Sequence, residues 1–381
     1  PTPPQTDQSA ATDGGGGGSA SASASNTPDP SAQSQQRRAE ALMEKARKLV
    51  DKAGLQADQK RVVRVLLDEF RNIVERGNTL YTNESAPTFV IQGNPGTGKS
   101  FIVVVLEQLV KELEIGVLGK CSYTGITAIN INGTTIQTLF DIGKVPADGA
   151  TRLAPMNTQR LRALQEKLGI NPSRNDDERH LMAVIVIDEI SLVTPTLLCC
   201  VDLRLQEATG LKEPFGGIPV IMLGDFCQLP PVQGTALTDA AVGMKIHDET
   251  NRRQLKNEQI RMWNSRGGVN AKKKGLIPVV RKGAYKRQST ADKKKAHSAS
   301  KRHAVNSLYR RGTKAFADSK FLIMSEQIRS GKDKRHTKFV KRLSHGKSIW
   351  LNDVKTGYKK LSAKDFKSGG DKWRFATILV A

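Results

Sequence analysis

The sequence has 381 residues, with 60 Lys and Arg against 37 Asp and Glu, so its formal net charge at pH 7 is +23. This length allows roughly two or three domains of ordinary size and a large apolar core. So large a positive charge favours a polyanionic partner, nucleic acid first and an anionic membrane surface second. No run approaches the ~20 apolar residues of a membrane-spanning helix, so we expect a soluble protein without a membrane partner.

The four cysteines give no sign of a metal site or of disulfide bonds. They show neither a C-x-x-C pair nor a histidine at ligand spacing, and they are Cys121, Cys199, Cys200 and Cys227. We therefore expect neither zinc nor a disulfide framework, and a reducing compartment. All four are expected to be small, buried, apolar side chains.

The first part of the chain is of low complexity. Residues 1–36 consist largely of Gly, Ser, Ala, Pro, Gln and Thr. Such a segment cannot bury enough apolar surface to offset the entropy of ordering it, which predicts a disordered tail over 1–36. From residue 37, apolar residues recur at three- and four-residue steps, as in QKRVVRVLLDEFRNIV, and predict helices up to about residue 76.

Four short apolar runs then alternate with helical segments. They are TFVIQ at 88–92, GVLGKCS at 116–122, LMAVIVI at 181–187 and IPVIML at 218–223. Nearly continuous apolar strands are typical of a parallel sheet with helices on both faces. We predict an α/β domain over 37–244.

The remainder of the chain changes in character twice. Residues 245–320 are rich in Lys and Arg and poor in large apolar residues. The alternatives for them are a flexible insertion or linker, a nucleic-acid-binding arm, a nuclear-import signal, or a solvated loop without a dedicated role. An apolar pattern returns over 321–381, which we expect to be the incomplete beginning of a second domain. Because KWRFATILVA at the end is typical of a buried strand, we expect the N-terminal portion of a longer protein.

The segment GNPGTGKS fits the phosphate-binding pattern G-x-x-x-x-G-K-[ST]. It follows a predicted strand and opens an apolar helix, which distinguishes it from an ordinary Gly-rich turn. Its backbone N–H groups can close around phosphate oxygens; Lys99 would reach the β- and γ-phosphates, and the Ser100 hydroxyl would bind Mg²⁺. The predicted nucleotide-binding residues of this loop are Gly93, Asn94, Pro95, Gly96, Thr97, Gly98, Lys99 and Ser100.

Two later strands end in side chains suited to hydrolysis. VIVIDEIS supplies Asp188, which can hold Mg²⁺ through water, and Glu189, which can orient and deprotonate an attacking water. GDFCQLPPV follows the next strand and carries Gln228 to the sheet edge where ligands bind, on a turn stiffened by two prolines. With the phosphate loop, these motifs predict nucleotide hydrolysis.

Taken in order, five stretches resemble the Pif-type (petite integration frequency) DNA helicases and their bacterial relative RecD, in helicase superfamily 1. They are GNPGTGKS, TGITAININGTTIQTLF, VIVIDEIS, GDFCQLPPV and FLIMSEQIRS, and the resemblance covers roughly residues 55 to 350. It implies a RecA-like P-loop NTPase domain followed by the start of a second RecA-like domain, and an ATP-driven motor with Mg²⁺. Such a motor moves 5′ to 3′ along single-stranded DNA and unwinds duplex DNA, in repair, recombination or telomere maintenance.

The resemblance also implies roles for individual residues. Gln59 would contact adenine, and Arg329 would reach the γ-phosphate from the second motor domain as a catalytic arginine beside Lys99, Glu189 and Gln228. The residues implied in contacts with the DNA backbone are Thr124, Gly125, Thr134, Thr135 and Gln137. Many members have His where this chain has Gln137, and we find no candidate for the last motifs of the family.

Two other functions stay open. One is a different P-loop ATPase acting on DNA, such as a loader or transposition ATPase. The other is a truncated relative that binds nucleic acid through its charge without turning over ATP. We expect a monomeric motor in the nucleus, with the mitochondrion as the alternative.

Overall fold

A computed structural model describes residues 30–75, 86–170, 181–250 and 306–329, with a few isolated residues between 252 and 338. The predictions for residues 1–29, for 254–303 and for 341–381 lie outside the described residues. Among the described helices, none combines the length and the apolar character needed to cross a bilayer.

The described residues contain a six-stranded sheet in the order β3-β2-β4-β5-β1-β6. Every pair of neighbouring strands is parallel. The strands are β1 (Thr88–Gly93), β2 (Val117–Ser122), β3 (Thr134–Thr135), β4 (Met182–Asp188), β5 (Val220–Gly224) and β6 (Lys320–Met324). The predicted parallel α/β fold is therefore confirmed.

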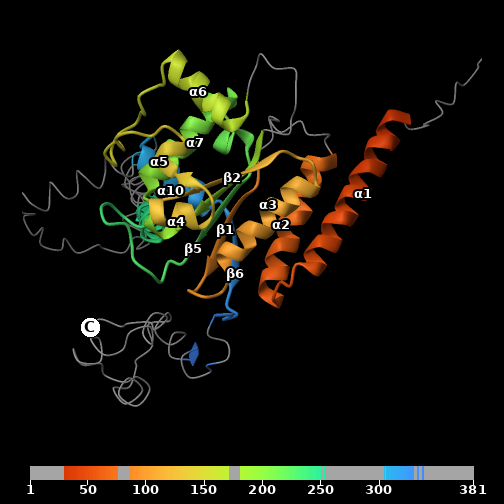
Figure 1. Cartoon of the computed structure of the whole chain (residues 1–381). Helices are drawn as coiled ribbons and strands as arrows, with labels where there is room; N and C mark the ends of the chain where they lie inside the picture. The colour runs from red at the N-terminus through yellow and green to blue at the C-terminus, as the bar shows by residue number, and fades with distance from the viewer. Residues whose placement is uncertain are drawn as a thin grey trace, which may run out of the picture.

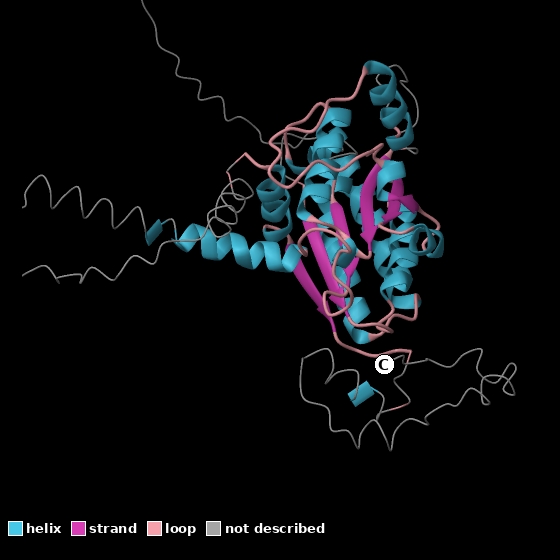
Figure 2. Cartoon of the chain, turned by 90° about the vertical axis from the view of Figure 1, so that its left-hand side faces the viewer, coloured by secondary structure: helices cyan, strands magenta, loops and turns pink. Residues whose placement is uncertain are grey.

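Helices cover both faces of this sheet (Figure 1). One layer holds α1 (Pro30–Lys52), α2 (Ala57–Glu75) and α3 (Lys99–Glu112), and the other includes α5 (Ile136–Leu139), α6 (Thr158–Leu168), α7 (Pro195–Thr209) and α10 (Leu308–Ala317). The described residues also form the short helices α4 (Gly125–Asn130), η2 (Ile190–Leu192) and η3 (Pro214–Gly217), and a further helix over 237–250. Figure 2 shows the strands between the two helical layers.

The apolar strands are continuous because each one packs on both sides. Ile185 and Ile187 of β4 join the core under α7, whereas Val184 and Val186 join the core under α3. Successive side chains of a strand point to opposite faces, so a strand buried on both faces needs apolar residues at every position.

The first helix begins earlier than the sequence predicts. α1 starts at Pro30, inside the range 1–36 that we expected to be disordered, so that prediction is wrong for residues 30–36. Its stripe of buried residues, which includes Leu42, Met43 and Val50, packs with α2 and α3. This packing anchors the helix, and the polar turns before the stripe extend it, since adding a residue to an existing helix costs little.

Two predicted domain boundaries are also wrong. Helical residues 237–250 and α10 belong to the packed fold, although the sequence predicts that the domain ends at residue 244. Arg310 of α10 donates two hydrogen bonds of 2.8 Å to the Asp248 carboxylate, and α10 packs against α7. Strand β6 pairs with β1 in parallel register, from Phe89 opposite Lys320 to Gly93 opposite Met324. Residues 320–324 are thus an edge strand of the first sheet and do not begin a second domain.

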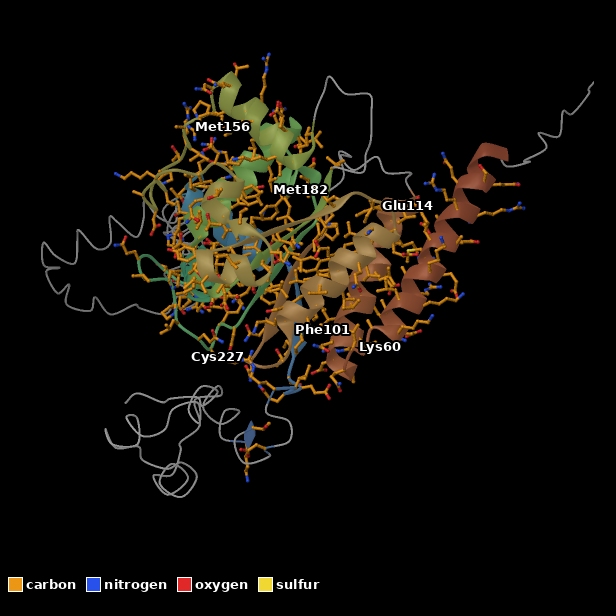
Figure 3. The ribbon with its side chains drawn as sticks, viewed as in Figure 1. Lys60, Phe101, Glu114, Met156, Met182 and Cys227 are labelled. Atoms are coloured by element: carbon orange, nitrogen blue, oxygen red, sulfur yellow. The ribbon has the colours of Figure 1, made fainter. Side chains whose placement is uncertain are left out.

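The carboxyl ends of the strands converge at one edge of the sheet. In Figure 3 the labels Lys60, Phe101 and Cys227 lie toward this edge, whereas Glu114 and Met182 mark the other end. Parallel α/β sheets bind ligands at the carboxyl edge, and the phosphate loop, the acidic pair and Gln228 follow strand ends at this edge.

Candidate active site

The phosphate loop connects β1 to α3. Gly98 is the N-cap of α3 with φ +79°, a left-handed conformation that glycine adopts without strain. Thr97 is buried, and its hydroxyl donates to the Asn94 carbonyl at 2.9 Å. The Lys99 ammonium donates to the Gly93 carbonyl at 2.6 Å, so the side chain folds back over the phosphate loop.

Lys99 faces carboxylates from two other strands. Burial lowers its pKa, and the nearby charges of Asp225, Glu189 and Asp188 oppose that shift. The sheet therefore brings the phosphate loop of β1 next to the acidic ends of β4 and β5, as the motifs predict.

The acidic pair ends β4 in two different environments. Asp188 is the last residue of the strand and is buried, whereas Glu189 is half-buried with φ +54°. The Glu189 N–H donates to Asp188 Oδ1 at 2.9 Å. Burial raises the pKa of both carboxyl groups, and the charge of Asp188 adds to the increase at Glu189. A glutamate with a raised pKa is a stronger base than an ordinary one.

The donor set predicted for a metal consists of oxygen atoms. Ser100 is exposed in the first turn of α3, and Asp188 lies at the end of β4. A hydroxyl and a carboxylate, completed by water and phosphate oxygens, suit the hard cation Mg²⁺. The residues fit the ion, and its binding here stays a prediction.

The turn after β5 is held by a residue that the motifs did not include. Gln92 of β1 donates from Nε2 to Asp225 Oδ1 at 2.9 Å and accepts from the Phe226 N–H at 3.0 Å. The same Asp225 oxygen accepts from the Cys227 N–H at 3.0 Å, and the Asp225 carbonyl accepts from the Gln228 N–H. Gln228 itself is exposed at this turn.

Asp225 and Gln92 are thus site residues that sequence reasoning missed. Asp225 had a signal, since an acid directly follows an apolar strand, but Gln92 is one amide in an apolar run. The prediction of four buried cysteines is also wrong, because Cys227 lies on this turn and is exposed.

Gln59 contacts the phosphate loop. The side chain is buried, its Nε2 lies 3.3 Å from both the Thr97 and the Gly98 carbonyl oxygens, and its Oε1 accepts from the Gln56 N–H at 3.0 Å. In this structure the amide supports the loop from α2, and its contact with adenine stays a prediction.

Arg329 lies beside the same loop. The N–H groups of Ile328 and Arg329 donate to the Gly96 carbonyl at 2.9 and 3.1 Å, and the charge of Arg329 contributes to the lowered pKa of Lys99. Its segment leaves β6 of the first sheet, so the expectation that Arg329 comes from a second domain is wrong. The sequence of an apolar strand does not reveal which sheet it joins.

The residues predicted to contact DNA gather beyond β2 and β3. These strands pair with Ser122 opposite Thr135, and each is followed by a short helix. Thr124 and Thr135 are the N-caps of α4 and α5, and each hydroxyl accepts from the N–H three residues later. Gly125 and Thr134 are exposed, and Gln137 is partly exposed.

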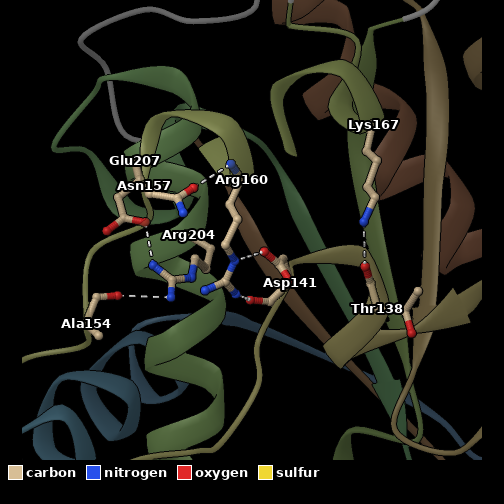
Figure 4. Close-up of polar contacts among 8 residues, drawn as sticks. All are labelled: Thr138, Asp141, Ala154, Asn157, Arg160, Lys167, Arg204 and Glu207. Atoms are coloured by element: carbon tan, nitrogen blue, oxygen red, sulfur yellow. Dashed lines mark hydrogen bonds and ion pairs between the residues drawn. The ribbon is translucent and has the colours of Figure 1, made fainter. Parts of the chain in front are cut away.

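Helix α6 holds the end of this region (Figure 4). Lys167 donates to the Thr138 carbonyl at 3.2 Å, and Arg160 donates to the Asp141 carboxylate at 2.6 Å. The hydroxyl groups of Thr124, Thr127 and Ser122 form a chain of hydrogen bonds. Its last member, Ser122, donates to the Asp188 carbonyl at 3.1 Å. One predicted DNA contact, Thr124, is thus connected to the end of β4 by hydrogen bonds.

A family model described as PIF1-like helicase matches residues 55–258, more than half of the chain. The chain belongs to the PIF1-like helicase family. The matched range includes the phosphate loop, the acidic pair and the turn that carries Gln228, whereas α10, β6 and Arg329 lie beyond it.

Two curated relatives illustrate the extent of the similarity. The ATP-dependent DNA helicase Pif1 of Bdellovibrio bacteriovorus is 29% identical over 167 residues, which cover 43% of this chain and 34% of that protein. The human ATP-dependent DNA helicase PIF1 is 34% identical over 141 residues, which cover 37% of this chain and 19% of that protein. The chain therefore spans about a third or less of the length of these family members.

One solved structure matches part of this chain. The Bacteroides Pif1 helicase in complex with ADP-AlF3 and single-stranded DNA is 28% identical, with a TM-score of 0.34. The match covers 47% of this chain and 34% of that one.

Proposed function

We propose that this chain is the ATP-hydrolysing part of a DNA helicase that moves 5′ to 3′ along single-stranded DNA and unwinds duplex DNA. The observation that supports this most is the convergence on Lys99 of carboxylates from the ends of two other strands. Its ammonium faces Asp188 and Glu189 of the β4 end and Asp225 of the β5 end, while the loop that carries it leaves β1. Repair, recombination and telomere maintenance are the processes that such a motor would serve.

Each residue has a role that follows from its chemistry. Lys99 would exchange a carbonyl contact for a phosphate oxygen, and the exposed amide of Gln228 would orient the attacking water. Glu189 would accept the proton of that water, helped by its raised pKa. Arg329 would stabilise charge on the transferred phosphoryl group, an effect worth about 10³–10⁵ in rate where an arginine finger acts. Mg²⁺ held by Ser100 and Asp188 would neutralise charge on the phosphate oxygens.

The DNA would lie beyond α4 and α5, near Thr124, Gly125, Thr134, Thr135 and Gln137. The formal net charge of +23 supports a nucleic-acid partner, because Lys and Arg that neutralise phosphates release counterions. We propose a monomeric motor in the nucleus, with the mitochondrion as the alternative compartment.

A second candidate function is DNA binding without turnover. The net charge of +23 favours it as well, and the chain covers about a third or less of the relatives that are named helicases. This function needs the positive charge of the chain and does not need the phosphate loop.

ATP hydrolysis measured with and without single-stranded DNA, beside a Lys99→Ala variant, separates the two. Hydrolysis that DNA stimulates and that Lys99→Ala lacks supports the motor. Salt-sensitive DNA binding, together with hydrolysis no faster than that of Lys99→Ala, supports the binding function and contradicts the motor.

A further inference from the structure

Two neighbouring residues in the first turn of α2 form hydrogen bonds with two separate segments of the active site. Gln59 contacts the phosphate loop, as described above. The preceding residue, Asp58, contacts the segment that leaves β6: its Oδ2 accepts from Ser325 N at 2.8 Å, Ser325 Oγ at 3.0 Å and Glu326 N at 3.0 Å. Three donors thus converge on one carboxylate oxygen.

The segment 325–329 is held at both of its ends. Asp58 holds its start, and the Gly96 carbonyl accepts from the N–H groups of Ile328 and Arg329 at its end. Gly96 allows this approach, since a Cβ at that position would lie 3.0 Å from the Cβ of Arg329. Arg329 is therefore carried by a short stretch with fixed ends.

Other contacts attach α2 to β6 itself. Arg61 donates to the Ile323 carbonyl at 2.6 Å, and Glu69 pairs with Lys320. Because these contacts precede Ser325, they keep β6 against α2 even when Asp58 is replaced. The Asp58 contacts, in contrast, determine how the chain leaves the strand toward the phosphate loop.

We propose that Asp58 is a positioning residue, which fixes segment 325–329 so that Arg329 is held at the phosphate loop. The catalytic part of this inference rests on the proposed function. Hydrogen bonds to an ionised acceptor are about twice as strong as neutral ones, so Asp58 restrains the segment more than a neutral residue does. An asparagine side chain keeps an acceptor oxygen of similar shape without the negative charge, which makes Asp58→Asn the conservative replacement.

The test compares Asp58→Ala and Asp58→Asn with a control, Asp51→Ala. Asp51 is also an acid that pairs with cations of α2, namely Lys60 and Arg64. The first readout is amide hydrogen exchange at Ile328 and Arg329, whose own bonds to Gly96 are untouched by the replacement. The second is kcat and KM for ATP, measured alone and in the Arg329→Ala background.

We expect Asp58→Ala to speed exchange at these two amides about tenfold, because a lost charge-assisted bond changes a local opening equilibrium by about that factor. We also expect a roughly tenfold lower kcat with KM within about twofold, partial recovery in Asp58→Asn, and no change in Asp51→Ala. In the Arg329→Ala background, Asp58→Ala should lower kcat by less than about twofold, since the residue through which it acts is gone.

Unchanged exchange in Asp58→Ala, or an equal loss of kcat with and without Arg329, would overturn the inference. A different result would refute the proposed function, namely ATP hydrolysis by the wild type that is no faster than hydrolysis by Lys99→Ala. In that case the exchange measurement still decides whether Asp58 fixes the segment.

Discussion

Gln92 and Asp225 bond to each other across two adjacent strands, with Gln92 Nε2 donating to Asp225 Oδ1 at 2.9 Å. Gln92 Oε1 accepts in turn from the Phe226 N–H, so both the nitrogen and the oxygen of this side-chain amide bond to the turn. The pair explains how an apolar strand, β5, ends in a defined turn. It fixes the backbone from which Gln228 projects.

Replacing Gln92 with Ala should loosen this turn. Because Asp225 is buried and loses a donor, we expect the free energy of unfolding to fall by about 1–3 kcal/mol. The kcat for ATP should fall about tenfold or more, since Gln228 is displaced. Urea denaturation and steady-state hydrolysis measure both effects. Gln165→Ala, which removes an amide bonded to the Ala208 carbonyl, is the control, and an equal kcat in both variants would contradict the role of Gln92.

The charge of Asp225 should set the pH range of activity. Burial raises the pKa of Glu189 and lowers the pKa of Lys99, and Asp225 raises both values. Asp225→Asn keeps an oxygen for Gln92 but removes the charge, so both pKa values should fall. Glu189 acts deprotonated and Lys99 acts protonated, and therefore both limbs of the profile of kcat/KM against pH should move to lower pH. Limbs that stay in place or move upward would refute this electrostatic account.

Gly98 and Gly210 provide a matched pair for the phosphate loop. Both have positive φ, +79° and +74°, but a Cβ on Gly98 would lie 2.3 Å from Gln59 Nε2, whereas a Cβ on Gly210 has no atom within 4 Å. Either alanine should cost about 1–2 kcal/mol of stability through backbone strain. Only Gly98→Ala should also weaken nucleotide binding, at least about tenfold, because it displaces the support of the loop. Titration with a fluorescent ATP analogue measures this, and equal affinities in the two variants would count against the Gln59 contact.

The close approach of α10 to α7 can be tested in the same way. A Cβ on Gly312 would lie 1.8 Å from the Pro195 carbonyl oxygen, whereas a Cβ on Gly143 meets nothing within 4 Å. Gly312→Ala should therefore destabilise the domain by about 1–3 kcal/mol or more, as overpacking does. Gly143→Ala should change the stability little. If chemical denaturation gave the two variants equal stability, α10 would not pack as described.

The strands that carry a motif can be predicted from the sequence, because in the structure they are buried on both faces. Doubly buried strands such as β4 and β5 are apolar throughout, and their ends are marked by Asp188 and Asp225. β3 has only two residues, Thr134–Thr135, which is too short for any periodic signal.

Long-range pairing is what the sequence could not reveal. The apolar run of β6 is equally compatible with a first or a second sheet, and its parallel pairing with β1 depends on residues far away in the chain. The same holds for Gln59 and Gln92, whose amides matter through partners 38 and 133 positions away. Local patterns therefore located the motifs, while the contacts that support them required the structure.

In the proposed function, Glu189 and the phosphate loop form one hydrolytic site. The most direct measurement is Mg²⁺-dependent ATP binding and single-turnover hydrolysis by Glu189→Gln beside the wild type. We expect ATP affinity within about threefold of the wild type and hydrolysis slower by about 10²–10⁴, the contribution of a general base. Hydrolysis by Glu189→Gln at the wild-type rate would show that Glu189 is not the general base of this site.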